Sequence, residues 1–313
     1  MKSKKLEGLS VVECRYGDWL WKLLSDDDSE IFADLQVVKS PREFDDYQLC
    51  GLYHKAGVPF DVFEVQYKPI EGMRVHEEIV NAYCHTILDA AKGGNPILFA
   101  GGHCTFAPGV AGGLRRALGE DKKIGIVWVD GHDDLKTEKT SDDRFLAGLP
   151  LATIIGLGME RWRLAAGLEK PLEGRFVLHS DCRVLTQETQ EDIDNSGVTI
   201  VDTIGFNDPK RWSYAVNKLA EQVDVIYLHV DIDILYGKYI PAFLVPTPGG
   251  NELTVVMDNI RTVMDTGKVF AFGVFNTCFM EGVPGQEITT LTGMKLIAAG
   301  LENWKEHPEI KHP

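Results

Sequence analysis

Short runs of apolar residues alternate along the chain with segments in which apolar residues recur at helical spacing. The runs at 96–100, 124–129 and 225–230 are rich in apolar residues and carry no polar face, which predicts buried strands. The segments 73–92 and 251–264 place apolar side chains three or four positions apart, which predicts amphipathic helices. Strands that alternate with helices indicate a parallel sheet with helices on both faces.

The other expected elements follow the same alternation. Their ranges are 9–15, 60–65, 175–179, 198–201 and 269–275 for strands, and about 105–118, 210–222 and 284–301 for helices. The segment 19–24 predicts a short helix that ends in a turn at Asp26–Asp28. Asn251 is expected to cap the helix that follows it, and Gly267 to end that helix. No linker or repeat divides the sequence, so we expect one domain over residues 1–313.

Composition narrows the class of partner. The chain is 44% hydrophobic, carries a formal net charge of −15 and has a sequence pI of about 5.0, which argues against nucleic acid or an anionic membrane as a partner. No apolar run approaches the ~20 residues of a bilayer span, and no apolar stretch follows the basic N-terminus as in a signal peptide. The six cysteines form no CxxC pair, so reduced thiols and a cytoplasmic location are expected.

Three polar clusters come directly after predicted strands. They are Gly101–Thr105, Asp130–Asp134 and Asp231–Asp233. In open parallel sheets the carboxyl ends of all strands lie at the same edge, and ligands bind just outside these ends. The three clusters are therefore expected to form one site.

The residue types in these clusters suit a divalent metal. Asp130, His132 and Asp134 are two residues apart, so an extended chain would point all three the same way, and Asp231 and Asp233 repeat this spacing. A donor set rich in oxygen favours Mn²⁺ or a similar hard ion over a structural zinc. Four carboxylates exceed the needs of one ion. Two ions bridged by carboxylate and hydroxide balance the charge better and lower the pKa of bound water.

Each cluster also has a structural interpretation. An aspartate at a strand end is often a helix cap or a turn residue, and the D-G-H-D-D segment alone is also compatible with a hydrogen-bonded loop. Asp133 is out of phase with its neighbours and is expected to be solvated or to support a ligand. His229 has the same strand parity as Asp231, but we interpret it as a core histidine rather than as the partner of a ligand.

The two aspartate motifs resemble the metal motifs of the ureohydrolase superfamily, which contains arginase, agmatinase and formimidoylglutamase. The match consists of D-G-H-D-D followed by L-K-T at 130–137, and of D-I-D-I-L at 231–235. Gly101–Cys104 resembles the family's upstream GGDHS motif, and shorter signatures match at Gly148–Pro150 and Pro248–Gly250. The resemblance covers roughly residues 95 to 300.

The resemblance implies an arginase-like three-layer α/β/α fold with an eight-stranded parallel sheet. It also implies a binuclear Mn²⁺ centre that hydrolyses a C–N bond in a guanidine or related group of a small molecule. Members of this family usually assemble as trimers or hexamers, so a homo-oligomer is expected on the same ground.

The resemblance also assigns roles to the residues of the two specific motifs. Asp130 and Asp231 would bridge the ions, while His132 and Asp233 would complete the shell of one ion. Asp134 would bind the other ion and orient the bridging hydroxide. That hydroxide would attack the planar amidine carbon, and a tetrahedral intermediate would expel the amine.

Two departures affect the metals and the proton path. Cys104 stands where the family has a metal-ligating histidine, and His103 stands at the preceding aspartate. A thiolate binds Mn²⁺ only weakly, so one metal site is expected to be weak, empty or filled by a softer ion. Cys104 is alternatively a small buried apolar residue. Ala147 replaces the histidine that shuttles protons in the family, and we assign that role to His103 as a hypothesis.

Further departures concern the substrate. Asn276 stands where the family has a glutamate that holds the guanidinium group, so the countercharge for arginine or agmatine is lost. Asn276 is expected instead to hydrogen-bond a neutral amide, a urea-like group or a modified guanidine. Lys136 is expected at the rim of the pocket. Its side chain either pairs with a substrate carboxylate or faces solvent.

The sequence thus predicts a metal-dependent hydrolase of a linear C–N bond in a guanidino, ureido or formimino group, with a substrate other than arginine. The alternative is a catalytically silent member that acts as a scaffold or a metal-binding sensor. The intact aspartate motifs favour catalysis, whereas Cys104, Ala147 and Asn276 favour the silent alternative.

Overall fold

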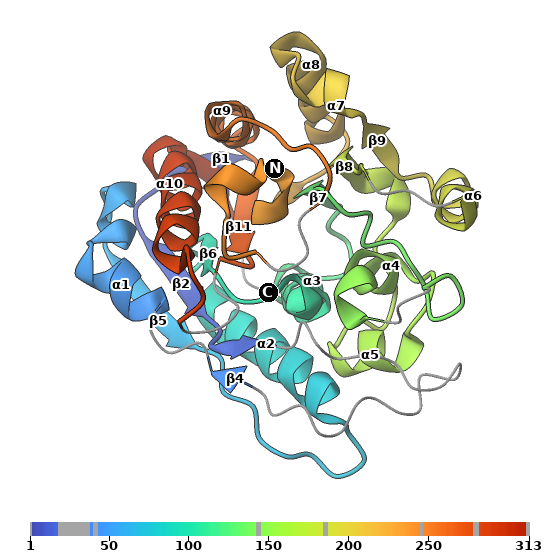
Figure 1. The fold of residues 1–313 in the computed structure, drawn as a ribbon. Coiled ribbons are helices and arrows are strands. Elements are labelled where there is room, and N and C mark those ends of the chain that lie inside the picture. The colour runs from blue at the N-terminus through green and yellow to red at the C-terminus, as the bar shows by residue number, and fades with distance from the viewer. Residues whose placement is uncertain are drawn as a thin grey trace.

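A computed structural model of the chain describes residues 2–17, 38–39, 43–141, 145–183, 187–243, 247–277 and 282–310. Its centre is an eight-stranded sheet in which all neighbouring strands pair in parallel (Figure 1). The spatial order is β5 (Phe60–Glu64), β2 (Leu9–Glu13), β6 (Ile97–Ala100), β11 (Val269–Phe275), β10 (Val225–Asp231), β7 (Ile124–Asp130), β8 (Val177–Asp181) and β9 (Thr199–Val201). The predicted parallel sheet is confirmed.

Helices cover both faces of this sheet, so the three-layer α/β/α arrangement is also confirmed (Figure 1). One face packs against α2 (Val75–Ala91), α3 (Ala107–Leu118), α4 (Pro150–Ile155) and α5 (Glu160–Ala165). The other packs against α8 (Pro209–Ala220), α9 (Leu253–Met264) and α10 (Gln286–Asn303). None of the helices in the described part of the chain combines the length and the apolar character that a bilayer span requires.

The central strand β7 explains why the strand sequences lack a polar face. Ile126 and Trp128 belong to the core beneath α2 and α3, whereas Val127 and Val129 belong to the core beneath α8 and α9. Successive side chains of a strand point to opposite faces, so a strand covered on both sides must be apolar at every position. All seven residues of β7 are buried.

Several short elements have no counterpart in the sequence prediction. The helices among them are α1 (Glu43–Leu49), α4, α5, α6 (Gln187–Ser196) and α7 (Thr203–Phe206), and the 3₁₀ turns are η1 (Leu52–Ala56), η2 (Cys104–Phe106), η3 (Leu146–Gly148), η4 (Gly174–Phe176), η5 (Ile232–Ile234) and η6 (Gly237–Tyr239). Two antiparallel ribbons pair β1 (Ser3–Lys5) with β12 (Glu306–Pro308) and β3 (Tyr16–Gly17) with β4 (Val38–Lys39). Elements this short carry too few periodic positions for a pattern to identify them.

Two details of the prediction are wrong, and one lies outside the described residues. The strand expected at 175–179 begins only at Val177, because η4 occupies the residues before it. Asn251 does not cap α9, because its Oδ1, the atom that would accept a helix N–H, accepts from Asn207 Nδ2 at 2.6 Å. Its Nδ2 donates to the Asp181 carboxylate at 2.6 Å and to the Ile234 carbonyl at 2.9 Å. The expected helix at 19–24 and its turn are not among the described residues.

Gly112 tests the contact between α3 and the turn after α5. A Cβ atom at this position would lie 1.8 Å from the carbonyl oxygen of Ala166. We expect Gly112→Ala to lower the free energy of unfolding by about 3 kcal/mol in denaturant titrations, because backbone rather than a flexible side chain must move. Gly237→Ala is the control, since a Cβ there meets nothing within 4 Å. Equal stability of the two variants would contradict this packing.

Candidate metal centre

Five adjacent strands carry polar residues to one edge of the sheet. In spatial order, β6 leads into Cys104, β11 into Asn276, and β10, β7 and β8 end at Asp231, Asp130 and Asp181. Because parallel strands share a direction, their carboxyl ends meet at the same edge. The three clusters expected from the sequence therefore lie beside one another, together with two residues from β8 and β11.

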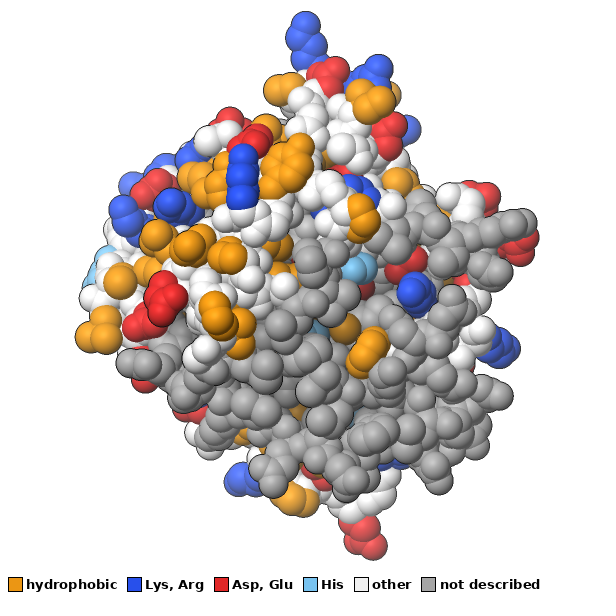
Figure 2. Space-filling view, in the orientation of Figure 1, with side chains coloured by type: hydrophobic (Ala, Val, Ile, Leu, Met, Phe, Trp, Pro, Cys, Tyr) orange, Lys and Arg blue, Asp and Glu red, His pale blue; other side chains and the backbone are white. Residues whose placement is uncertain are grey.

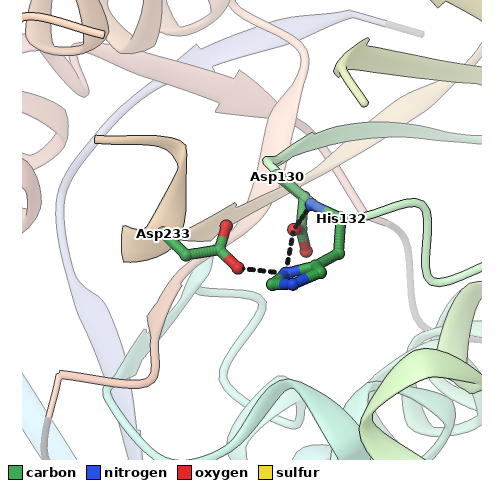
Figure 3. Close-up of side chains that lie close together, drawn as sticks. All are labelled: Asp130, His132 and Asp233. Atoms are coloured by element: carbon green, nitrogen blue, oxygen red, sulfur yellow. Dashed lines mark hydrogen bonds and ion pairs between the residues drawn. The ribbon is translucent and has the colours of Figure 1, made fainter. Parts of the chain in front are cut away.

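Asp130, His132 and Asp233 form the most compact group at this edge (Figure 3). One donor atom from each lies within 4.8 Å of the others. The His132 ring faces the Asp233 carboxylate and its Nδ1 lies 3.9 Å from Asp130 Oδ1. Gly131 donates its backbone N–H to Asp233 Oδ1 at 2.8 Å, which fixes the turn after β7 against η5. These three side chains have the donor types and the spacing of a divalent metal site.

The aspartates converge through tight turns and not through an extended chain, so the expected strand alternation is wrong. β7 ends at Asp130, and the His132 N–H folds back to Asp130 Oδ1 at 2.7 Å. Asp134 has a left-handed backbone with φ 50°. Asp231 caps η5, because its Oδ1 accepts the Asp233 N–H at 3.1 Å. The capping interpretation and the metal interpretation of Asp231 are thus compatible in one geometry.

Asp134 and Asp231 are buried beside the compact group. Burial and the nearby Asp130 carboxylate raise the pKa of Asp134 well above its usual range. Asp134 Oδ2 is buried without a hydrogen-bond partner among the described residues. Burial and the Asp233 carboxylate likewise raise the pKa of Asp231. Both shifts mean that the protein itself compensates these negative charges incompletely.

His132 supplies one positive charge to the group. Burial lowers its pKa, but the Asp233 carboxylate outweighs this effect and raises the pKa of His132 to about 9. Burial opposes ionisation of Asp233 as well, yet His132 holds its pKa below the usual value. One imidazole set against the carboxylates of Asp130, Asp134, Asp231 and Asp233 leaves an excess of buried negative charge. These residues therefore fit a divalent cation.

Cys104 and His103 lie at the start of η2, next to the carboxylates. Cys104 is buried, and burial followed by the Asp134 charge raises the pKa of its thiol well above the usual value. Its Sγ lies 3.3 Å from Asn276 Nδ2. His103 Nδ1 lies 2.8 Å from Thr105 Oγ1 and 3.8 Å from Cys104 Sγ. Burial lowers the pKa of His103 to about 3, so this imidazole is neutral at pH 7.

The loop after His132 contains Asp133, Lys136 and Ala147. Asp133 is buried, so the expectation that it is solvated is wrong. Burial raises the pKa of Asp133, and the Lys136 ammonium and a hydrogen bond from Thr189 oppose this rise. The Lys136 N–H binds the Gly148 carbonyl at 3.1 Å, which closes this loop beside the site. Ala147 is half-buried and packs against the core.

A stack of aromatic rings lies beneath the carboxylates. The His229 ring is parallel to Trp128 at 3.6 Å and nearly parallel to Phe275 at 4.2 Å, and these three residues belong to adjacent strands. His229 Nδ1 lies 2.8 Å from the Tyr227 hydroxyl, and burial lowers the pKa of His229 well below its usual value. His229 is a core histidine, as expected. Trp128 Nε1 donates to Asp130 Oδ2 at 3.1 Å, so the stack holds Asp130.

Arg183 is a supporting residue that the sequence prediction missed. Its guanidinium forms an ion pair with Asp181 and donates from Nη2 to the Asp233 carbonyl at 2.9 Å. It also contacts Thr247 and donates from Nε to the Pro248 carbonyl at 3.1 Å. The Arg183 side chain is 10% exposed. The signal was the polar run from His179 to Arg183, a fourth cluster that follows a predicted strand.

Solvent reaches the compact group at His132. The His132 side chain is 31% exposed, whereas those of Asp130 and Asp233 are each 1% exposed. Figure 2 shows histidine and acidic side chains at the surface near the middle of the face that Figure 1 presents. Of the three members, His132 is therefore the one that faces solvent.

Substitutions at Arg183 and Asp181 test whether their ion pair supports the Asp233 segment of the site. Arg183→Met leaves the buried Asp181 carboxylate with its hydrogen bonds from Asn251 and Thr203 but without its cation, which we expect to cost about 3 kcal/mol of unfolding free energy. It should also weaken Mn²⁺ binding at least about tenfold, since the Asp233 carbonyl loses a donor. Asp181→Asn combined with Arg183→Met is expected to recover much of the stability. Denaturant titration and calorimetric Mn²⁺ titration measure the two effects. A double variant no more stable than Arg183→Met would argue against a buried ion pair.

Comparisons with known proteins agree with this arrangement. The model of the family described as "Arginase family" matches residues 39–299. The arginase of Entamoeba histolytica is 27% identical over 180 residues, which are 56% of this chain and 58% of that protein. The arginase of Brevibacillus brevis is 26% identical over 58% of this chain and 61% of that protein. The matched part of the chain thus spans less than two thirds of these curated relatives.

Solved structures with the same fold align over nearly the whole chain. The crystal structure of Entamoeba histolytica arginase in complex with L-ornithine has a TM-score of 0.77 and 18% identity, covering 95% of this chain and 99% of that one. Formimidoylglutamase from Bacillus subtilis has a TM-score of 0.69 and 11% identity, covering 96% and 88%. At identities this low the structural matches establish the fold alone, and the family model establishes membership of the family. This chain is a divergent member of the ureohydrolase superfamily and belongs to the arginase family.

Proposed function

We propose that this protein is a metal-dependent hydrolase of a linear C–N bond in a guanidino, ureido or formimino group of a small molecule. The observation that carries the proposal is the group of Asp130, His132 and Asp233, whose donor atoms lie within 4.8 Å of one another in a chain of the arginase family. Relatives of the same fold are named arginase, formimidoylglutamase and proclavaminate amidino hydrolase, and two of these names refer to a formimidoyl and an amidino group.

Two divalent ions, most simply Mn²⁺, are proposed at this site. His132 and Asp233 would hold one ion, Asp134 and Cys104 the other, and Asp130 and Asp231 would contact both. When bound, the ions lower the pKa of a water molecule and polarise the bond to be cleaved. The Asp134 carboxylate would accept a hydrogen bond from that water and orient it. Its unpartnered Oδ2 supports this role.

The remaining proposed roles concern protons and substrate. His103 is proposed to relay a proton to the leaving amine; with a pKa of about 3 it would hold that proton only transiently. Lys136 is proposed to pair with a substrate carboxylate. Asn276 is proposed to select a neutral group, because it brings no negative charge for a guanidinium. A substrate other than arginine follows from this assignment.

A catalytically silent scaffold or metal sensor is the second candidate. The observation that favours it is the pairing of Asn276 with both Cys104 and Asp231, which commits two proposed ligands to an amide. A catalytically silent protein would bind metal without turning over a substrate. The two candidates therefore differ in activity and not in fold.

A cytoplasmic location and a homo-oligomeric state, a trimer or hexamer, are further proposals. Within the described residues the cysteines form no disulfide, in keeping with a reducing compartment. Size-exclusion chromatography with light scattering would determine the oligomeric state.

Turnover separates the two candidates. We expect Mn²⁺-loaded protein to release urea, ammonia or formamide from at least one compound in a panel of guanidino, ureido and formimino substrates. Asp134→Asn should lower kcat at least a hundredfold, because the water loses its orienting carboxylate. The exposed Asp265→Asn serves as the control and should retain full activity. Full activity of Asp134→Asn would refute the mechanism, and a panel without turnover would support the silent candidate.

Metal binding should also stabilise the fold. At a free Mn²⁺ concentration about a hundred times Kd, linkage adds ~2.7 kcal/mol, which raises the Tm by about 5 °C. Asp233→Asn should abolish most of this rise, because it weakens the compact group. The same Asp265→Asn control should keep the rise. An unchanged Tm with and without Mn²⁺ would count against a metal centre.

A further inference from the structure

Asn276 lies between the strands that lead to Cys104 and Asp231, two of the proposed ligands of the second ion. It follows β11, whose neighbours in the sheet are β6 and β10. Its backbone N–H donates to the Gly102 carbonyl at 2.8 Å, and its φ is 65°, a left-handed conformation that a non-glycine residue adopts at a cost. The residue is 3% exposed. The fold therefore fixes Asn276 at this junction.

The Asn276 side chain makes three directed contacts there. Its Oδ1 accepts the Cys104 N–H at 3.3 Å, and its Nδ2 lies 3.3 Å from Cys104 Sγ. Nδ2 also donates to Asp231 Oδ2. The direction of the amide is set by these contacts, because only the NH₂ group can donate to a carboxylate. A hydrogen-bond donor thus occupies the point on which Cys104 and Asp231 converge.

The position of the first ion has a different character. There the groups that converge are the carboxylates of Asp130 and Asp233 and a ring nitrogen of His132, all of which are able to ligate a metal. No side-chain amide donates to these two carboxylates within the described residues. At the first position the His132 ring is hydrogen-bonded to Asp233 through a nitrogen that can itself ligate a metal. At the second position the cation meets an NH₂ group that offers no lone pair.

We propose that the Asn276 amide takes the place of the second metal ion and must move away before that ion binds. Binding at the second position then requires two hydrogen bonds of the amide to break, one of them to a carboxylate. The ions load in sequence: the first binds at Asp130, His132 and Asp233, and the second binds at least about tenfold more weakly. The inference rests on the proposed metal-dependent function and assigns Asn276 a role in metal loading.

Two substitutions at Asn276 test the inference by metal titration. Asn276→Gly removes the amide and suits the left-handed backbone, and Asn276→Asp keeps the size of the side chain while replacing the donor with an acceptor. Calorimetric titration of metal-free full-length protein with Mn²⁺ gives both dissociation constants. We expect the second Kd to fall about tenfold in each variant, with less than a twofold change in the first.

Electron paramagnetic resonance provides a readout that a merely structural role of Asn276 would not move. With one equivalent of Mn²⁺, the wild-type protein should show the spectrum of an isolated ion. At a second equivalent, the variants should show an exchange-coupled pair at a lower free Mn²⁺ concentration than the wild type. Asn259→Ala is the matched control, because Asn259 is also a buried amide, bound to the Phe206 carbonyl at 2.8 Å. It should leave both constants unchanged.

The outcomes separate this inference from the proposed function. Equal affinity for two ions in the wild type would overturn the inference, as would a second Kd that neither variant lowers. Binding of one ion alone in the wild type and in both variants would overturn the inference while leaving a metal-dependent function. Failure of every form to bind Mn²⁺ would overturn both.

Discussion

Repulsion among carboxylates buried at adjacent strand ends is the constraint on which this site depends. Asp130, Asp134, Asp231 and Asp233 are each at most 3% exposed, and desolvated like charges resist ionisation. The fold answers with groups from β7 and the turn after it: the His132 imidazole, the Trp128 indole and the Gly131 amide. These donors leave part of the buried negative charge uncompensated, and a bound cation would compensate it.

The architecture makes this crowding unavoidable. A sheet buried on both faces disfavours charged side chains along its strands, so the carboxylates lie at the strand ends. The order β6–β11–β10–β7–β8 then places segments that are distant in sequence next to one another. Cys104 and Asn276 are 172 residues apart and share a hydrogen bond. Arg183 follows β8, the next strand of the sheet, and its guanidinium donates to the backbone carbonyl of Asp233.

The sequence predicted the long elements well, because strands buried on both faces and amphipathic helices leave periodic signals. It also located Asp130, His132 and Asp233, since each follows an apolar run that predicts a strand. It failed where tertiary contacts outweigh local pattern. Asn251 suits a helix cap by type but binds Asp181, and the turns that unite Asp130 with His132 do not follow strand periodicity. Asp181 and Arg183 went unrecognised as a pair because an ion pair has no characteristic spacing, although the polar run that contains them follows a predicted strand.

The parallel rings of Trp128, His229 and Phe275 have a consequence for how such a protein can change over evolutionary time. Each ring rests on its neighbour, and one of them also holds Asp130, so replacing any single ring disturbs three strands and a carboxylate together. Cys104 and Asn276 come after their strands have ended, outside this stack. A substitution there can leave the packing of the three rings in place, whereas a substitution within the stack cannot.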